Sequence, residues 1–146
     1  MKDEEIEKYI DLLNKKTYAE TIFIRQISEF VDVAKVWDSF PEVTDLVNNE
    51  SPSMDFFFIR NERGSYIGAV YVMMNDLHWY IQQAFRKKGY LTKALKKAII
   101  PYLFDVKCKK EIVVTIPPHN EPSKKVALGI CMKIEAKSFQ RIELKF

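Results

Sequence analysis

The sequence contains little glycine and cysteine, and it has no long apolar segment. Only 4 of its 146 residues are glycine, and its 2 cysteines, Cys108 and Cys131, lie far apart and outside any Cys-x-x-Cys pair. Two isolated cysteines form neither a disulfide framework nor a zinc site, so we expect free thiols and no metal. The longest apolar runs, residues 69–74 and 98–102, are much shorter than the roughly 18 residues that cross a bilayer. We therefore expect neither a transmembrane helix nor a membrane partner.

An excess of charge of one sign is also missing. The 23 lysine and arginine residues and the 20 acidic residues leave a formal charge of +3, which does not by itself indicate nucleic-acid binding. The amino terminus begins Met1-Lys2-Asp3-Glu4-Glu5, and the apolar core of a secretory or mitochondrial leader does not follow it. These features predict a cytoplasmic protein.

Apolar and aromatic residues are plentiful, at 47% and 13% of the chain. A domain of this length buries roughly two-thirds of the surface that its unfolded chain exposes, so it folds without disulfides or metals. The sequence has no internal repeat or low-complexity tract, and its Pro-containing stretches at residues 51–53 and 117–122 are predicted loops. We expect one domain over residues 1–146, with residues 1–20 as a helical extension.

The first part of the chain is predicted to be mostly helical. Apolar residues at helical spacing behind an acidic first turn predict an amphipathic helix over residues 3–15. Residues 21–25 are typical of a short strand. A second helix is predicted over residues 28–40 and a shorter one over 41–47, because their apolar residues also follow helical spacing.

The rest of the chain predicts strands that flank one long helix. Aromatic and β-branched runs at 55–60 and 65–74 enclose a loop with a glycine, which predicts a hairpin, and residues 77–83 extend it to a three-stranded antiparallel meander. Leucines and alanines at helical spacing predict a long helix over residues 90–104. The remaining predicted elements are a strand at 111–116, a short helix at 122–130, and a final strand at 139–146 whose hairpin turns at 136–138. The sum is a mixed α/β (α+β) fold.

The loop that joins the strand at 77–83 to the long helix is strongly basic. It reads Phe85-Arg86-Lys87-Lys88-Gly89-Tyr90-Leu91-Thr92. The start of a helix has unpaired N–H groups and a positive dipole end that repel cations, so basic residues there favour a bound phosphate. Because Gly89 is the only glycine of the loop, neither a P-loop nor a Rossmann motif fits. The alternative interpretation is a solvated basic turn.

The same residues resemble the GNAT superfamily of acyl-CoA-dependent N-acyltransferases. The phosphate loop of that family has Gln or Arg, two variable residues, Gly, one variable residue, and Gly or Ala, and residues 86–91 follow this order up to Leu91. The resemblance extends through Asn120-x-x-Ser123 and spans residues 55–133. It is greatest to the ribosomal-protein alanine N-acetyltransferase branch, because of Ser123 and Ala127. It implies a mixed, mostly antiparallel sheet with a splayed parallel βαβ pair and flanking helices.

The resemblance also implies where acetyl-CoA, the co-substrate, would bind. The pantetheine arm would pair with the backbone of Ile81, Gln82 and Gln83 between the splayed strands, and an N–H of Ile81 or Gln82 would polarise the thioester carbonyl. Asn120 and Ser123 would lie beside the thioester. The pyrophosphate would rest on the loop and the first helical turn, at Arg86, Lys87, Lys88, Gly89, Tyr90, Leu91 and Thr92. The expected partner is a small-molecule or protein amine, and a homodimer is left open.

Acetyl transfer needs a group that takes a proton from the amine and a group that donates to the leaving thiolate. Ser123 is the predicted donor, although a serine at the start of a helix is often a structural cap. His78 is the predicted base, since histidine titrates near neutral pH, although a lone histidine on a strand is often exposed or structural. Asp76 and His119 are weaker alternatives for the base.

The sequence therefore favours an N-acetyltransferase that acts by direct attack of a primary amine in a ternary complex. Leu91, Ala127 and Cys131 depart from the common family pattern, and they leave open a second hypothesis, a CoA-binding regulatory module that is weakly active or inactive. A third hypothesis is nucleic-acid binding by the basic residues 86–97. Because Tyr90 is the only aromatic residue within this segment, we expect no nucleic-acid partner.

Overall fold

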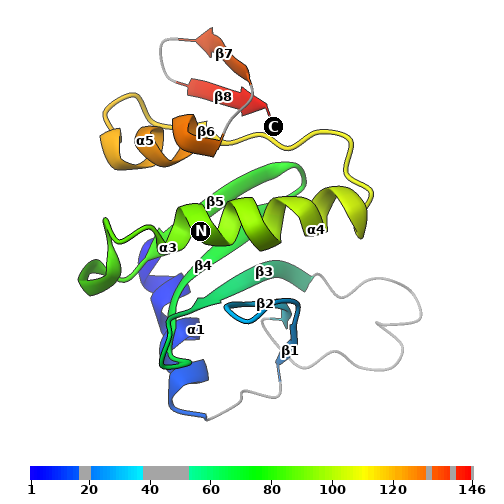
Figure 1. Cartoon of the computed structure of the whole chain (residues 1–146), viewed down its shortest axis with the longest axis vertical. Coiled ribbons are helices and arrows are strands. Elements are labelled where there is room, and N and C mark those ends of the chain that lie inside the picture. The colour runs from blue at the N-terminus through cyan, green and yellow to red at the C-terminus, as the bar shows by residue number, and fades with distance from the viewer. Residues whose placement is uncertain (17–20, 38–52, 131–132, 139–140, 146) are drawn as a thin grey trace.

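The computed structural model describes residues 1–16, 21–37 and 53–130, together with the backbone of residues 133–138 and 141–145 (Figure 1). Its first elements are α1 (Asp3–Asn14), β1 (Ile22–Gln26), β2 (Val31–Trp37), β3 (Ser53–Arg60), β4 (Tyr66–Met73) and β5 (Asp76–Ile81). A short turn of 3-10 helix, η1 (Gln83–Phe85), leads into one long helix made of α3 (Tyr90–Ala94), η2 (Leu95–Ile99) and α4 (Ile100–Asp105). The last elements are β6 (Thr115–Ile116), α5 (Glu121–Ile130), β7 (Lys133–Ser138) and β8 (Arg141–Lys145).

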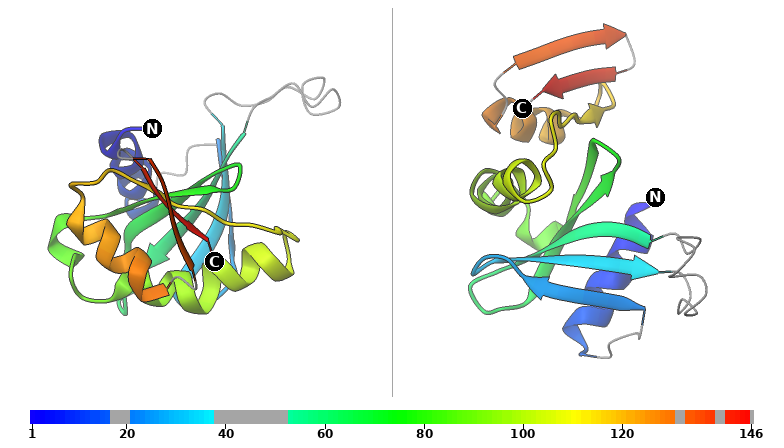
Figure 2. Two further views of the ribbon diagram at one scale, coloured as in Figure 1. Left: turned by 90° about the horizontal axis from the view of Figure 1, so that it is seen from above. Right: turned by 90° about the vertical axis from the view of Figure 1, so that its right-hand side faces the viewer.

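The strands form two sheets. β1 to β5 make a five-stranded antiparallel sheet in chain order, and β6, β8 and β7 make a three-stranded antiparallel sheet. Figure 2 shows the long helix between the five-stranded sheet and α5. The mixed, mostly antiparallel fold predicted from the sequence is confirmed.

Two apolar clusters hold the helices to the five-stranded sheet, because alternate residues of each strand face opposite sides. On one side, α1 buries Ile6, Ile10 and Leu13 against Phe56 and Phe58. The predicted helix over residues 3–15 is thus confirmed. The other side holds the long helix, β6 and α5 through a cluster that includes Phe57, Leu77, Leu95, Ile99, Ile116 and Ala127.

The predicted helix over residues 28–40 is wrong, because residues 31–37 form β2. Their sequence, Val-Asp-Val-Ala-Lys-Val-Trp, fits both helical and strand spacing, and its β-branched valines favour a strand. β2 also pairs with β1 on one side and with β3 on the other, which fixes it in the sheet. Its buried Asp32 forms an ion pair of 3.0 Å with Arg60 of β3. Residues 38–40 and the predicted helix over 41–47 lie outside the described residues.

The end of the chain differs from the prediction in two places. The predicted turn at residues 136–138 is wrong, since Ala136 and Ser138 belong to β7 and pair with Ile142 and Arg141 of β8. The predicted strand at 111–116 is shorter, because only the two residues of β6 and one bridge at Val113 pair. The predicted hairpin, long helix and short helix are confirmed as β3 with β4, α3 to α4, and α5. Within the described part of the chain, no helix has the length and apolar character needed to cross a membrane.

Gly68 of β4 lets the end of β5 lie close to its neighbour. A Cβ atom at Gly68 would collide with Cδ1 of Ile81 and would lie 2.8 Å from the carbonyl oxygen of Tyr80. Any larger residue therefore forces β4 and β5 apart where β5 leads into the basic loop.

We predict that Gly68→Ala lowers the free energy of unfolding by about 1–3 kcal/mol, as overpacking of a core does. Urea denaturation measures this change. Gly129→Ala is the matched control, because a Cβ atom at this residue of α5 meets nothing within 4 Å and alanine favours a helix. We expect Gly129→Ala to be neutral or stabilising, and an equal loss of stability in the two variants would contradict the close packing at Gly68.

Candidate functional site

β5 forms one parallel bridge with Val113, two residues before β6, and the two segments then separate. The Leu77 N–H donates to the Val113 carbonyl at 3.0 Å, and the Val113 N–H donates to the Asn75 carbonyl at 2.8 Å. In a continued parallel ladder, the next bond would run from the Thr115 N–H to the Leu77 carbonyl. The Thr115 N–H instead donates to the Asp76 carboxylate at 3.0 Å. β6 then pairs with β8, so the splayed parallel pair predicted from the sequence is confirmed.

The separation leaves one edge of β5 free. The Gln82 N–H donates to the Ile67 carbonyl of β4 at 2.9 Å, and successive N–H groups of a strand point to opposite sides. The N–H groups of Trp79 and Ile81 therefore point away from β4, toward the side from which β6 departs. Neither has a backbone acceptor among the described residues. Of the two N–H groups predicted to polarise a thioester, that of Gln82 is committed to β4, and only that of Ile81 lies at the free edge.

The basic loop follows directly and ends at a glycine in the left-handed conformation. After the exposed Gln83, the chain passes through Lys87, with a φ of 61°, and Gly89, with a φ of 83°. The first bond of the long helix joins the Lys93 N–H to the Gly89 carbonyl at 3.0 Å. The N–H groups before it have no helical acceptor. They belong to Tyr90, Leu91 and Thr92.

The side chains around these N–H groups leave a basic surface. Leu91 is buried in the core, so it offers only its backbone to a ligand. Lys87 and Lys88 are exposed, and neither forms a salt bridge within the described residues. Unpaired N–H groups with nearby cations are typical of a site for phosphate.

Arg86 is directed toward β5. Its Nε–H donates to the Ile81 carbonyl at 2.8 Å, and its guanidinium lies 5.6 Å from the centre of the Tyr80 ring. These contacts hold the loop against the end of the strand. The structure therefore places Arg86 as an anchor of the loop, and the contact of its guanidinium with phosphate stays a prediction.

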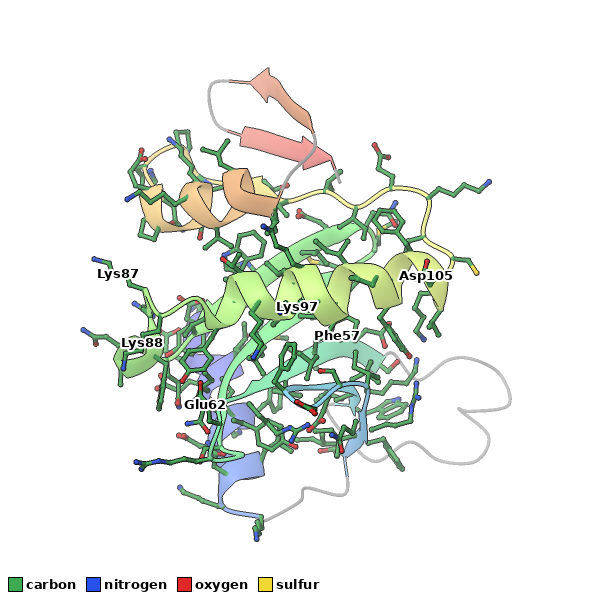
Figure 3. The ribbon with its side chains drawn as sticks, in the orientation of Figure 1. Phe57, Glu62, Lys87, Lys88, Lys97 and Asp105 are labelled. Carbon is green, nitrogen blue, oxygen red and sulfur yellow. The ribbon has the colours of Figure 1, made fainter. Side chains whose placement is uncertain are left out.

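Glu62, in the hairpin between β3 and β4, lies beside the basic loop. The Tyr90 hydroxyl donates to its carboxylate at 2.6 Å. This hydrogen bond lowers the pKa of Glu62, and the charges of Lys93 and Lys88 lower it further. Glu62 and Tyr90 line, with Gln82, an open cavity of about 410 Å³, and Figure 3 shows Glu62 at the same end of the molecule as Lys88. No local sequence pattern indicates Glu62, because its contact with Tyr90 joins residues that are far apart in the chain.

Asn120 and Ser123 lie at the start of α5, where they have different partners. The Asn120 side chain accepts a hydrogen bond from the Ser123 N–H at 3.3 Å, and its carbonyl accepts from the Lys124 N–H at 3.1 Å. Asn120 therefore caps the helix. The Ser123 hydroxyl is not the cap, and it accepts a hydrogen bond from the indole Nε1–H of Trp79 at 3.1 Å. This bond connects α5 to the free edge of β5, and no sequence pattern had indicated Trp79.

The structure does not bring His78 and Ser123 together. Side chains alternate along β5, and Trp79 faces the cluster of the long helix and α5, so His78 faces the side of α1. There its Nε2 lies 3.7 Å from the Asp3 carboxylate. His119 is exposed in the loop before α5. Among the described residues, no group of three or more metal-binding side chains occurs.

Comparison with known proteins connects this geometry to a family. The family model described as the acetyltransferase (GNAT) domain matches residues 1–133. A mutant of spermidine N-acetyltransferase from Vibrio cholerae is 13% identical, with 100% of this chain and 90% of that chain covered and a TM-score of 0.58. A proposed ribosomal-protein-serine acetyltransferase from the same organism is 15% identical, with 100% and 90% covered and a TM-score of 0.56. An acetyltransferase from Agrobacterium tumefaciens is 17% identical, with 64% and 60% covered and a TM-score of 0.55.

These structures share the fold at low sequence identity. The chain spans less than two thirds of the Agrobacterium protein, and 63% of an acetyltransferase from Bacillus anthracis. Among curated proteins, none matches the sequence significantly. Ribosomal-protein acetyltransferases are one kind of structural neighbour among several, so the branch is not distinguished. The family model covers most of the chain, and the protein belongs to the GNAT acetyltransferase family.

Proposed function

We propose that this protein transfers the acetyl group of acetyl-CoA to a primary amine. The free edge of β5, which leads directly into the basic start of the long helix, is the observation that carries the proposal. An unpaired strand edge binds amide groups as a neighbouring strand would, and pantetheine is a chain of such groups. The phosphates fit the unpaired N–H groups of residues 90–92 and the charges of Lys87 and Lys88. One continuous stretch of chain thus complements both parts of the co-substrate.

The residues of the site have separate roles in this proposal. Acetyl-CoA, when bound, supplies a thioester whose carbonyl carbon an amine attacks. The Ile81 N–H at the free edge is available to donate to the carbonyl oxygen, where negative charge develops. The hydroxyl of Ser123 is available to donate to the sulfur. We do not propose His78 as the base that takes a proton from the amine, because its side chain faces α1.

A second function, a CoA-binding regulatory module, is favoured by one observation. The resemblance to the family implies that many of its members have a tyrosine at the position of Ala127, and Ala127 is fully buried in the core. An alanine at this position donates no proton. The two functions share the CoA site and differ in whether an amine is consumed.

Several expectations from the sequence remain predictions. They are a single domain over residues 1–146, with residues 1–20 as a helical extension, and a cytoplasmic location, while a homodimer stays open. Spermidine and a peptide with a free amino terminus are suitable probes, because one protein that shares the fold is named for spermidine and another for a ribosomal protein.

The direct test of the proposed function is release of free thiol from acetyl-CoA in the presence of amines. We predict that thiol release depends on both the protein and the amine, and that spermidine or a peptide with a free amino terminus supports it. Binding of CoA, seen by calorimetry, without release for any amine would support the regulatory module. Absence of CoA binding would contradict both functions.

Gly89→Val tests the phosphate loop. A β-branched residue disfavours the left-handed conformation of Gly89, so we predict that the affinity for acetyl-CoA falls at least about tenfold as the N–H groups lose their alignment. Gly64→Val is the matched control, because Gly64 has a φ of 80° and equally open surroundings in another loop. We expect it to keep the affinity within about twofold. Unchanged affinity in Gly89→Val would show that the loop does not bind phosphate.

Glu62→Gln tests the charge beside the loop. Glutamine still accepts the hydrogen bond of Tyr90, but it no longer offsets the charges of Lys88 and Lys93. We predict an affinity for acetyl-CoA about two- to fivefold higher at low salt, with the difference disappearing at high salt. Glu4→Gln, on the exposed surface of α1, makes the same change in net charge. An equal change in the affinity for acetyl-CoA in the two variants would contradict a local interaction between Glu62 and the basic loop.

A further inference from the structure

The hydrogen bond between Trp79 and Ser123 joins the two elements that enclose the proposed thioester site. It connects the indole of β5 to the hydroxyl of α5 at 3.1 Å, in partly buried surroundings. The inference drawn from this bond rests on the proposed function. We propose that Trp79 is a positioning residue, whose indole N–H orients the Ser123 hydroxyl so that its proton faces the leaving sulfur.

The chemistry of the two groups gives this bond a fixed direction. The indole of tryptophan is a donor only, whereas a serine hydroxyl has one proton to donate and two lone pairs that accept. The Ser123 proton therefore cannot point toward Trp79. Among the described residues, no acceptor is found for the Ser123 hydroxyl. After the bond to Trp79 forms, one donor and one acceptor site of this hydroxyl remain for a ligand.

The backbone of Trp79 gives a second reason to place the sulfur nearby. Its N–H lies on the free edge of β5, which is the edge proposed to pair with pantetheine. The same residue thus presents its backbone to the arm that carries the sulfur and its side chain to Ser123. The hydroxyl also lies in the first turn of α5, capped by Asn120, where the helix dipole favours negative charge such as that of a thiolate.

The proton balance of the transfer agrees with a hydroxyl that has one donor and one acceptor site. The amine nitrogen forms a bond to the carbonyl carbon, the C–S bond breaks, and the sulfur keeps the electron pair. The nitrogen must then lose one proton, and the sulfur must gain one. Ser123 can give its proton to the sulfur while it accepts one that derives from the amine, directly or through water. It remains a neutral hydroxyl, and no further reactant is needed.

Nuclear magnetic resonance of the indole N–H groups tests the placement without any turnover. The described residues contain Trp37 and Trp79, and Trp37→Phe and Trp79→Phe identify their signals. We expect CoA to shift the Trp79 signal more than desulfo-CoA does, because desulfo-CoA lacks the sulfur. Ser123→Ala should remove that difference. If both compounds shift the Gly89 amide signal but affect the Trp79 signal equally, the role of Trp79 is wrong, whereas the proposed CoA site is supported. If neither compound shifts any signal, the inference and the proposed function both fail.

Kinetics test whether the bond matters for transfer. We predict that Trp79→Phe, which keeps an aromatic ring, lowers kcat about tenfold and leaves the dissociation constant of acetyl-CoA within about twofold. The double variant with Ser123→Ala should be no slower than Ser123→Ala alone, since the two residues act as one unit. Trp37→Phe is the matched control, because the Trp37 indole N–H has no partner in the described residues. Additive losses in the double variant, or an equal loss in Trp37→Phe, would overturn the assignment.

Discussion

The site depends on one hydrogen bond, in which the Asp76 carboxylate accepts from the Thr115 N–H. That N–H is the group that would continue the parallel ladder from β5 to β6. The Thr115 N–H is hydrogen-bonded to the Asp76 side chain, the parallel ladder has a single bridge, and β6 pairs with β8. The backbone of Trp79 then lies at a free edge of β5. This edge is beside α5 and close to the sheet of β6, β8 and β7. A single carboxylate thus binds the backbone at the point where the two sheets separate and leave the edge of β5 free.

The charges of the loop are arranged around this edge. Arg86 is bound to the end of β5 through the Ile81 carbonyl, so its charge fixes the position of the loop. Lys87 and Lys88 remain exposed and can meet an anion. Glu62 opposes them from the neighbouring hairpin, where its hydrogen bond from Tyr90 holds it in place. Without an anion, this carboxylate reduces the mutual repulsion of the cations at the helix start, and in the proposed complex the phosphates take over that role.

The sequence predicts the parts of this arrangement that depend on neighbouring residues. The hairpin, the long helix and the basic loop follow from spacing and from Gly89, and each is present. Spacing alone does not distinguish the strand at residues 31–37 from a helix, because its valines satisfy both spacings, and the pairing with two other strands decides the outcome. The partners of Ser123 and Glu62 come from distant elements, so no local pattern indicates them. The role of Asn120 as a helix cap is local, but it depends on the residue at which α5 begins, and the sequence predicts that start one residue too late.

The most direct measurement of the central claim is a structure of the protein with CoA. We predict that the pantetheine arm and its thioester lie along the free edge of β5, at the N–H groups of Trp79 and Ile81, and that the pyrophosphate lies on the N–H groups of residues 90–92. The sulfur should then lie within hydrogen-bond distance of the Ser123 hydroxyl. CoA bound in the cavity beside Glu62, or bound without contact to the edge of β5, would contradict the account.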